Sequence, residues 1–127
     1  MDYHVSSKVE KRGILAGMLL GVAYKRQHNF YIQQPAHQED YLLFKQRLLE
    51  QITGKPANLY SRYNQKGDRF LRLEPKLIPL TRVLLKKLYP GGGKSKKITR
   101  EFLELLTLPG IAIWFLDRGS QSFKKKR

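Results

Sequence analysis

The apolar segment 14–23 (Ile-Leu-Ala-Gly-Met-Leu-Leu-Gly-Val-Ala) contains the pattern that most restricts how this chain can fold. Gly13, Gly17 and Gly21 recur every four residues, which places all three on one face of a helix. Each glycine costs a helix about 1 kcal/mol relative to alanine, so three on one face indicate a compensating contact. The usual one is the close approach of a second helix. Because the run is about half of what a membrane span needs, we expect a helix buried by protein.

A second apolar segment near the end of the chain is a candidate partner for this helix. Residues 111–119 (Ile-Ala-Ile-Trp-Phe-Leu-Asp-Arg-Gly) align with residues 15–23 without a gap, so that Ala112 matches Ala16 and Leu116 matches Leu20. We therefore predict a helix pair with approximate twofold symmetry, although two unrelated core helices would also explain the pattern. The predicted interface consists of Gly13, Gly17, Gly21, Ala112 and Leu116.

The rest of the chain alternates between strand-like and helix-like patterns, which predicts an α+β fold. Alternating apolar residues predict strands at 24–33, 58–65 and 69–74. Helical spacing of apolar residues predicts further helices at 37–53, 77–89 and 99–106. We expect one domain over residues 1–120, followed by a basic tail at 121–127.

The strongly basic composition restricts the partners of this chain. Twenty-five Lys and Arg against ten Asp and Glu give a formal net charge of +15. Such an excess indicates an anionic partner, and nucleic acid fits better than a membrane surface because no basic amphipathic helix or lipidation signal is present. Cysteine is absent, which excludes disulfides and thiolate chemistry. Because charged residues interrupt any signal-peptide pattern at the start, we expect a cytoplasmic or organellar-matrix protein that is not secreted.

The two apolar helices resemble the paired motifs of the LAGLIDADG homing endonucleases, in the branch with two motifs per chain. Residues 15–21 (Leu-Ala-Gly-Met-Leu-Leu-Gly) follow the first motif. Residues 108–120 (Leu-Pro-Gly-Ile-Ala-Ile-Trp-Phe-Leu-Asp-Arg-Gly-Ser) follow the second, which in one branch ends in Trp-Phe-Met-Asp-Asp-Gly-Ser. The passage between them adds similar positions: Phe30, Gln33, His37, Tyr41, Leu42 and Lys97-Ile98.

This resemblance implies an αββαββα unit whose sheet lies in the DNA major groove, with the second motif helix packed on the first. Family members with two motifs repeat the whole unit, whereas this chain has two motif helices and one sheet. The resemblance also implies one acidic residue at the end of each motif helix, which would hold a divalent metal over a phosphate.

Val22 and Arg118 occupy the two positions where the resemblance implies acidic residues. Neither side chain can bind a metal ion, so we predict no metal site and no cofactor. Asp117, one position early, is the remaining acidic candidate, and its alternative role is that of an ordinary aspartate at a helix end. Mg²⁺ would be needed only if Asp117 formed a rearranged metal site.

The predicted strands and the basic connector contain side chains suited to nucleic acid. Gln and Asn can pair with adenine, and Arg and Lys with guanine, although an ordinary solvent-facing sheet surface is also polar. The strand candidates are Lys25, Gln27, Asn29, Gln33, Arg62, Asn64, Lys66, Arg69 and Arg72. Phosphate contacts are predicted at Lys94, Lys96, Lys97 and Arg100.

Three functions are compatible with these patterns. The one we favour is a cleavage-inactive descendant of a LAGLIDADG endonuclease that binds DNA, or structured intron RNA as the related maturases do. The first alternative is an active DNA endonuclease with a rearranged metal site or one acting as a homodimer. The second alternative is a small basic structural component of a ribonucleoprotein assembly.

Overall fold

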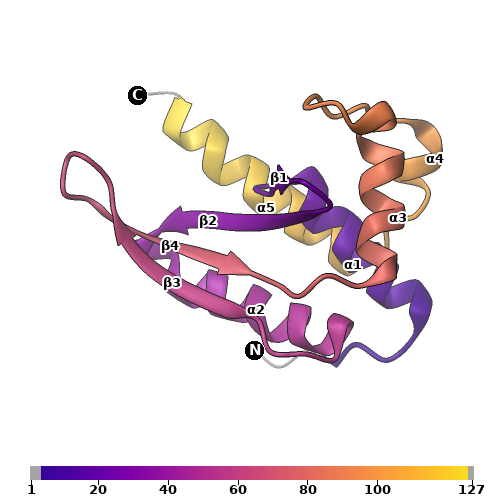
Figure 1. The fold of residues 1–127 in the computed structure, drawn as a ribbon, viewed down its shortest axis with the longest axis horizontal. Coiled ribbons are helices and arrows are strands. Elements are labelled where there is room, and N and C mark those ends of the chain that lie inside the picture. Colours follow the sequence, from indigo (N-terminus) through magenta and orange to yellow (C-terminus); the bar gives the residue numbers. More distant parts are fainter. Residues whose placement is uncertain (1–3, 126–127) are drawn as a thin grey trace.

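The first helix, α1 (Lys8–Leu20), passes through the middle of the fold in a computed structural model that describes residues 4–125 (Figure 1). A capping box starts the helix: the Glu10 amide donates to Ser7 Oγ at 3.1 Å, and the Ser7 amide donates to Glu10 Oε1 at 3.2 Å. The helix ends before Gly21, whose backbone leaves the helical region. The expectation of a buried helix is confirmed, because every residue from Gly13 to Leu20 is buried.

A four-stranded antiparallel sheet in the order β1-β2-β4-β3 packs against the helices. Its strands are β1 (Tyr24–Arg26), β2 (Asn29–Pro35), β3 (Asn58–Tyr63) and β4 (Arg69–Glu74). The inner face carries Phe30 and Ile32 from β2 and Leu71 and Leu73 from β4, all buried, as the alternating pattern predicted. The sheet therefore has one covered face and one open face.

The remaining helices complete an αββαββα order that is followed by two more helices. They are η1 (Ala36–Gln38), α2 (Glu39–Thr53), α3 (Pro79–Leu88), η2 (Pro90–Gly92), α4 (Arg100–Leu103) and α5 (Leu108–Lys125). Helix α2 stops at Gly54, which adopts the left-handed conformation with φ 72°. The predicted α+β class is confirmed, whereas the predicted domain boundary after residue 120 lies inside α5.

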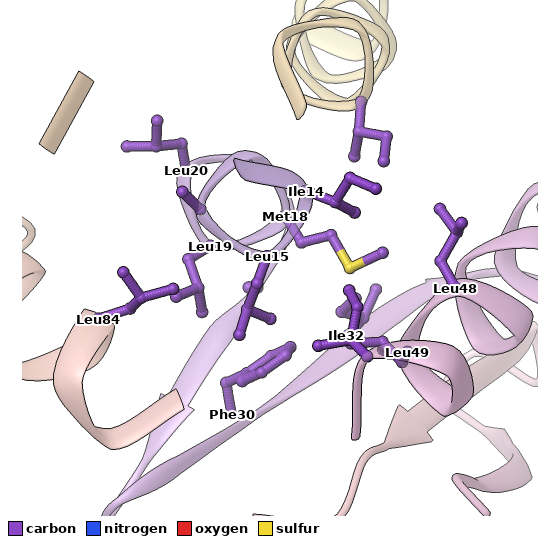
Figure 2. Packing of buried hydrophobic residues seen from close by; sticks show 14 of the residues in the cluster. Ile14, Leu15, Met18, Leu19, Leu20, Phe30, Ile32, Leu48, Leu49 and Leu84 are labelled. Carbon is purple, nitrogen blue, oxygen red and sulfur yellow. The ribbon is translucent and has the colours of Figure 1, made fainter. Parts of the chain in front are cut away.

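The hydrophobic core lies between α1 and the inner face of the sheet (Figure 2). Leu15 and Leu19 of α1 are 1% exposed and point toward the strands, where Phe30 and Ile32 meet them. Burying each such side chain contributes roughly 1.5–3 kcal/mol relative to exposure. The core thus fixes α1 against the sheet, and α1 in turn positions the residues that follow its C-terminal end.

Within the described part of the chain, no helix has the length and apolarity that crossing a bilayer requires.

Candidate nucleic-acid interface

The glycines of α1 form the contact surface for α5, as their spacing predicted. A Cβ atom on Gly17 would overlap the backbone of Gly110, and one on Gly110 would overlap the carbonyl of Gly13. A Cβ on Gly13 would overlap the side chain of Thr107, and one on Gly21 the carboxylate of Asp117. The two backbones therefore touch around Gly13, Gly17 and Gly110, while the space beside Gly21 is filled by the Asp117 side chain; this close contact compensates for the low helix propensity of glycine.

The prediction that Ala112 and Leu116 contact α1 is wrong. Both residues are exposed, Leu116 at 55%, and both line a groove between α5 and α2. The buried face of α5 carries Ile113 and Asp117, which align with Gly17 and Gly21 of α1. Ala112 and Leu116 each lie one residue away from that face, a rotation of about 100° around the helix. The sequence alignment itself was compatible with the structure, but the wrong face was assigned to the interface.

The foot of the helix pair, which we define as Gly21, Val22, Lys96, Asp117 and Arg118, corresponds to the position where acidic residues were expected. Asp117 is 1% exposed, and its Oδ2 accepts a hydrogen bond from the Val22 amide at 3.1 Å. This bond ties the end of α1 to α5. Asp117 therefore has a defined structural role.

The other oxygen of Asp117 is held by α2. Its Oδ1 lies 2.7 Å from Lys45 Nζ and accepts a hydrogen bond from the Tyr41 hydroxyl at 2.9 Å. Burial lowers the pKa of Lys45, and the nearby Asp117 charge opposes that change. Burial and then the Asp117 charge raise the pKa of Tyr41. Gln34 Oε1 accepts a further bond from Lys45 at 3.1 Å, so the buried ammonium group is well solvated by protein.

Sequence reasoning missed Lys45, Tyr41 and Gln34 as members of this cluster. A signal was present, because Lys45 lies between Leu42 and Leu49 on the apolar face of a predicted helix. A charged residue at such a position is seldom fully buried unless it is paired.

These residues do not fit a divalent metal. Mg²⁺ prefers several oxygen ligands in an open, regular geometry, whereas the one carboxylate at the foot already receives bonds from three donors. The two expected ligand positions carry an apolar Val22 and a cationic Arg118. Within residues 4–125, moreover, no group of three His, Asp or Glu side chains is close enough to hold a metal ion.

The open face of the sheet, called here the outer face, combines tyrosines with arginines and glutamine. The Tyr31 ring stacks on Tyr24 with centroids 5.4 Å apart. The Arg72 guanidinium lies 4.3 Å from the Tyr31 centroid and donates two hydrogen bonds to Gln33 Oε1, at 3.0 and 3.2 Å. The strand register places on the outer face Tyr24, Arg26, Asn29, Tyr31, Gln33, Pro35, Asn58, Tyr60, Arg62, Phe70, Arg72 and Glu74.

Lys25 and Gln27 do not lie on the outer face, so their predicted placement beside Asn29 and Gln33 is wrong. A two-residue turn at Gln27 and His28 folds the segment back, and Lys25 pairs with Phe30 of the inner face. The pairing reverses which residues share a face, because partners across a hairpin point the same way. Lys25 instead lies 5.8 Å from the Tyr89 ring centroid.

Arg26 and Tyr24 take the outer positions that were assigned to Lys25 and Gln27. The Arg26 guanidinium lies 5.3 Å from the Tyr31 ring centroid and 3.2 Å from a Glu74 carboxylate oxygen. Sequence reasoning missed the turn because Gln27 adopts a positive φ of 57°, which is uncommon for a residue other than glycine.

The other predicted strand residues are divided between several places. Asn29 donates its amide to the Pro75 carbonyl at 2.9 Å, and Asn64 accepts two backbone bonds that hold the β3–β4 turn. Lys66 is exposed in that turn. Arg69 faces away from the outer face, because its Nε donates to Ser61 Oγ at 2.8 Å and Ser61 is paired with the inward-pointing Leu71.

The basic connector reaches the foot of the helix pair at one residue. Lys96 Nζ donates to the Gly21 carbonyl at 3.3 Å, while Lys94, Lys97 and Arg100 are exposed. Burial and then the Arg118 charge lower the pKa of Lys96, and the Asp117 charge opposes them. Lys96 is thus within electrostatic range of Arg118.

Comparison with known proteins places these features in context. A family model described as the LAGLIDADG DNA endonuclease family matches residues 12–127. Proteins named RecA from Mycolicibacterium flavescens and Mycolicibacterium chitae are each 33% identical over 106 residues, which is 84% of this chain and 22% of theirs. The chain therefore spans about a fifth of these curated relatives.

A solved structure has a similar fold. The homing endonuclease I-WcaI, bound to its DNA recognition sequence, matches with a TM-score of 0.61 and 24% identity. The match covers 91% of this chain and 53% of that chain, which is about half of the larger molecule.

Proposed function

Because the chain belongs to the LAGLIDADG DNA endonuclease family, we propose that it binds duplex DNA through the outer face of its sheet and does not hydrolyse it. The observation that carries this proposal is the chemistry of the outer face. Gln33 Oε1 is bonded to Arg72, which leaves the amide N–H groups of Gln33 and the remaining guanidinium N–H groups of Arg72 as donors of the kind that read base edges in the major groove. The major groove of DNA is wide enough to admit a two-stranded β-ribbon.

The arginines of the outer face are held in place before any ligand arrives. Arg72 lies against Tyr31, and the Arg62 guanidinium lies 5.6 Å from the Tyr60 ring centroid. A side chain that is already ordered loses less entropy on binding. The net charge of +15 adds long-range attraction to a polyanion.

The absence of hydrolysis is inferred from the foot of the helix pair. Val22 and Arg118 provide no carboxylate, and the Asp117 carboxylate is occupied by Lys45, Tyr41 and the Val22 amide. Binding without cutting is therefore the activity that this arrangement supports best.

The binding half of the proposal is tested with a fluorescently labelled duplex of mixed sequence over a range of salt concentrations. We expect affinity to fall steeply with salt, and the double variant Arg62→Ala/Arg72→Ala to bind at least about fivefold more weakly, as expected for the loss of about 1–3 kcal/mol. The matched control is Lys8→Ala/Lys55→Ala, which removes the same charge at exposed sites away from the outer face. Equal weakening by both double variants would contradict the proposal.

The cutting half is tested by incubation of plasmid DNA with the protein and Mg²⁺ or Mn²⁺. We expect the plasmid to stay intact. A specific cut would contradict the proposal and favour the rearranged metal site.

In the duplex-binding assay, structured RNA is added as a competitor at matched phosphate concentration. If it displaces the duplex as well as unlabelled duplex does, DNA is not the preferred partner.

A further inference from the structure

We propose that a cavity between the β1–β2 turn and helix α3, called here the α3 cavity, binds a small phosphorylated molecule with a flat apolar body. Nucleoside monophosphates belong to this class of ligand. The cavity has a volume of about 670 Å³, within the range of about 300–1,000 Å³ that is typical of small-molecule sites. This ligand is additional to the duplex proposed above.

The charged side chains around the α3 cavity are cationic. Lys25 of β1 and Arg82 and Lys86 of α3 all line it, and its described lining contains no Asp or Glu. None of the three forms an ion pair within residues 4–125, whereas the neighbouring Arg26 pairs with Glu74 at 3.2 Å. Cations that converge on one hollow from two elements favour an anion, and a phosphate can accept charge-assisted hydrogen bonds from each of them.

Lys25 is held in place beside the cavity before any ligand arrives. Its Nζ lies 5.8 Å from the ring centroid of Tyr89, which also lines the cavity. The ring attracts the ammonium group without supplying a hydrogen-bond acceptor, so N–H donors of Lys25 remain for a ligand. A side chain that is already ordered loses less entropy on binding.

The C-terminal end of α3 borders the cavity, and free carbonyls at such an end would repel an anion. Two of these carbonyls are occupied. Leu88 accepts a hydrogen bond from the Lys97 amide at 2.8 Å. Tyr89 accepts one from the Gly92 amide at 3.1 Å. Lys86 in the last turn opposes the helix dipole as well, so the cationic side chains determine the sign of the site.

The base of the cavity suits an apolar body. Leu85 and Tyr89 are 4% and 6% exposed and line it together with Gly91 and Gly92. The two glycines have no side chain to fill the hollow, and a Cβ on either would meet no atom within 4 Å. Apolar walls with a few polar groups that fix orientation are typical of small-molecule sites. A phosphate joined to a flat apolar group therefore matches this cavity better than inorganic phosphate alone.

Gln27 at the edge of the cavity has a strained backbone. Its φ is 57°, in the left-handed region that glycine favours, and its side chain lines the cavity. Strain of this kind is found mostly at ligand-binding and active sites. The turn at Gln27 is thus a second observation that indicates a ligand here.

The cavity lies on the covered side of the sheet. Lys25 pairs with Phe30, whose side chain is buried in the core, and residues paired across a hairpin point the same way. Both therefore point away from the outer face. Because β1 is the edge strand of the sheet, the cavity lies beside that edge, and a duplex on the outer face would leave it open.

The site is tested by NMR titration of the isotopically labelled full chain with adenosine monophosphate (AMP) and, separately, with inorganic phosphate. Both should give saturable shifts of the Gln27, Gly91 and Gly92 amide signals. AMP should bind at least about fivefold more tightly, because its base adds contact with the apolar base of the cavity. Absence of these shifts with AMP, or equal affinity for AMP and inorganic phosphate, would overturn the inference.

The cationic side chains are tested with the double variant Arg82→Gln/Lys86→Gln, which should bind AMP at least about tenfold more weakly. The control Lys76→Gln/Lys87→Gln removes the same charge from exposed lysines in or beside α3 that do not line the cavity. Unchanged amide signals in the core verify that each variant is folded. Equal weakening by both double variants would overturn the inference, because the attraction would then reflect net charge alone.

A final titration separates this site from the proposed function. With one equivalent of duplex DNA bound, AMP should still shift the three amide signals with the same midpoint. Loss of the AMP shifts would mean that the duplex occupies the cavity, which would overturn the inference. Failure of the wild type to bind any duplex would instead refute the proposed function, and the AMP titration of the free protein would then decide the inference alone.

Discussion

Lys45 and Asp117 have 0% and 1% of their side chains exposed, so their charges have left water almost completely. Removing an ion from water costs several kcal/mol, and that cost is offset only when partners satisfy the group in every direction. Here Gln34 accepts a hydrogen bond from Lys45, and the Tyr41 hydroxyl and the Val22 amide donate hydrogen bonds to Asp117. The cluster also joins α2 and α5 to the segment that follows α1, so its loss should affect the whole fold.

Replacing Lys45 with Met should lower the free energy of unfolding by about 3–5 kcal/mol, because Asp117 is left buried without a counter-charge. Urea unfolding measures this change. The double variant Lys45→Met/Asp117→Leu should recover part of the loss, since no uncompensated charge remains. Lys55→Met, at an exposed lysine, is the control and should be nearly neutral. If the Lys45 and Lys55 variants behaved alike, the pair would have no structural role.

Tyr41 should make the protein less stable at alkaline pH. Its pKa is raised above the usual value of 10 by burial and by Asp117, so the folded state keeps a proton that the unfolded chain releases. The stabilisation from Tyr41 is therefore complete below pH 10 and is lost as the pH rises above it, by up to about 1.4 kcal/mol per pH unit.

Urea unfolding at several pH values below and above 10 tests this dependence. Tyr41→Phe should be destabilising below that pH, and its deficit relative to wild type should shrink above it. Tyr63→Phe, at a tyrosine that is 68% exposed, should show no such convergence. A constant deficit for Tyr41→Phe across the pH range would refute the prediction.

At the scale of elements, the contact between α1 and α5 depends on missing side chains. Gly17→Ala should lower the free energy of unfolding by about 2 kcal/mol, because its methyl group would overlap the Gly110 backbone and overpacking outweighs the helix propensity gained. Gly93→Ala is the matched control, with a φ of −66° and a nearest atom at 3.8 Å. Its stability should change by no more than about 0.5 kcal/mol. Denaturant unfolding measures the stability of both variants. An equal loss of stability in the two would contradict the prediction.

The elements also differ in how far their sequence predicts them. The helix pair and the inner residues of the sheet were predictable, because glycine spacing and alternation report directly on contact and burial. The outer residues of β1 were not, because a turn at Gln27 without glycine reversed the faces of the strand. The cluster around Asp117 was missed because its members come from the segment between α1 and β1, from α2, from β2 and from α5, and no local pattern connects them.

At the scale of the whole molecule, the two motif helices are covered unequally. Leu15 and Leu19 of α1 are 1% exposed beneath the sheet, whereas the aligned residues of α5, Ile111 and Phe115, are 44% and 74% exposed. The approximate symmetry of the pair thus ends at the helices, since only one of them is covered by a sheet within the described residues. An apolar strip of this kind favours association with other surfaces.

The exposed strip of α5 should make the isolated chain self-associate as its concentration rises. Phe115→Gln should shift the equilibrium toward the monomer, because it removes the larger and more exposed of the two apolar side chains, Ile111 and Phe115, without adding charge. Sedimentation velocity at a series of concentrations measures the effect, with salt high enough to screen the basic surface. Val83→Gln, at an apolar residue of α3 that is 49% exposed, is the control. A wild-type protein that sediments as a monomer at every concentration would contradict the prediction, as would an equal shift in both variants, because the association would then not depend on α5.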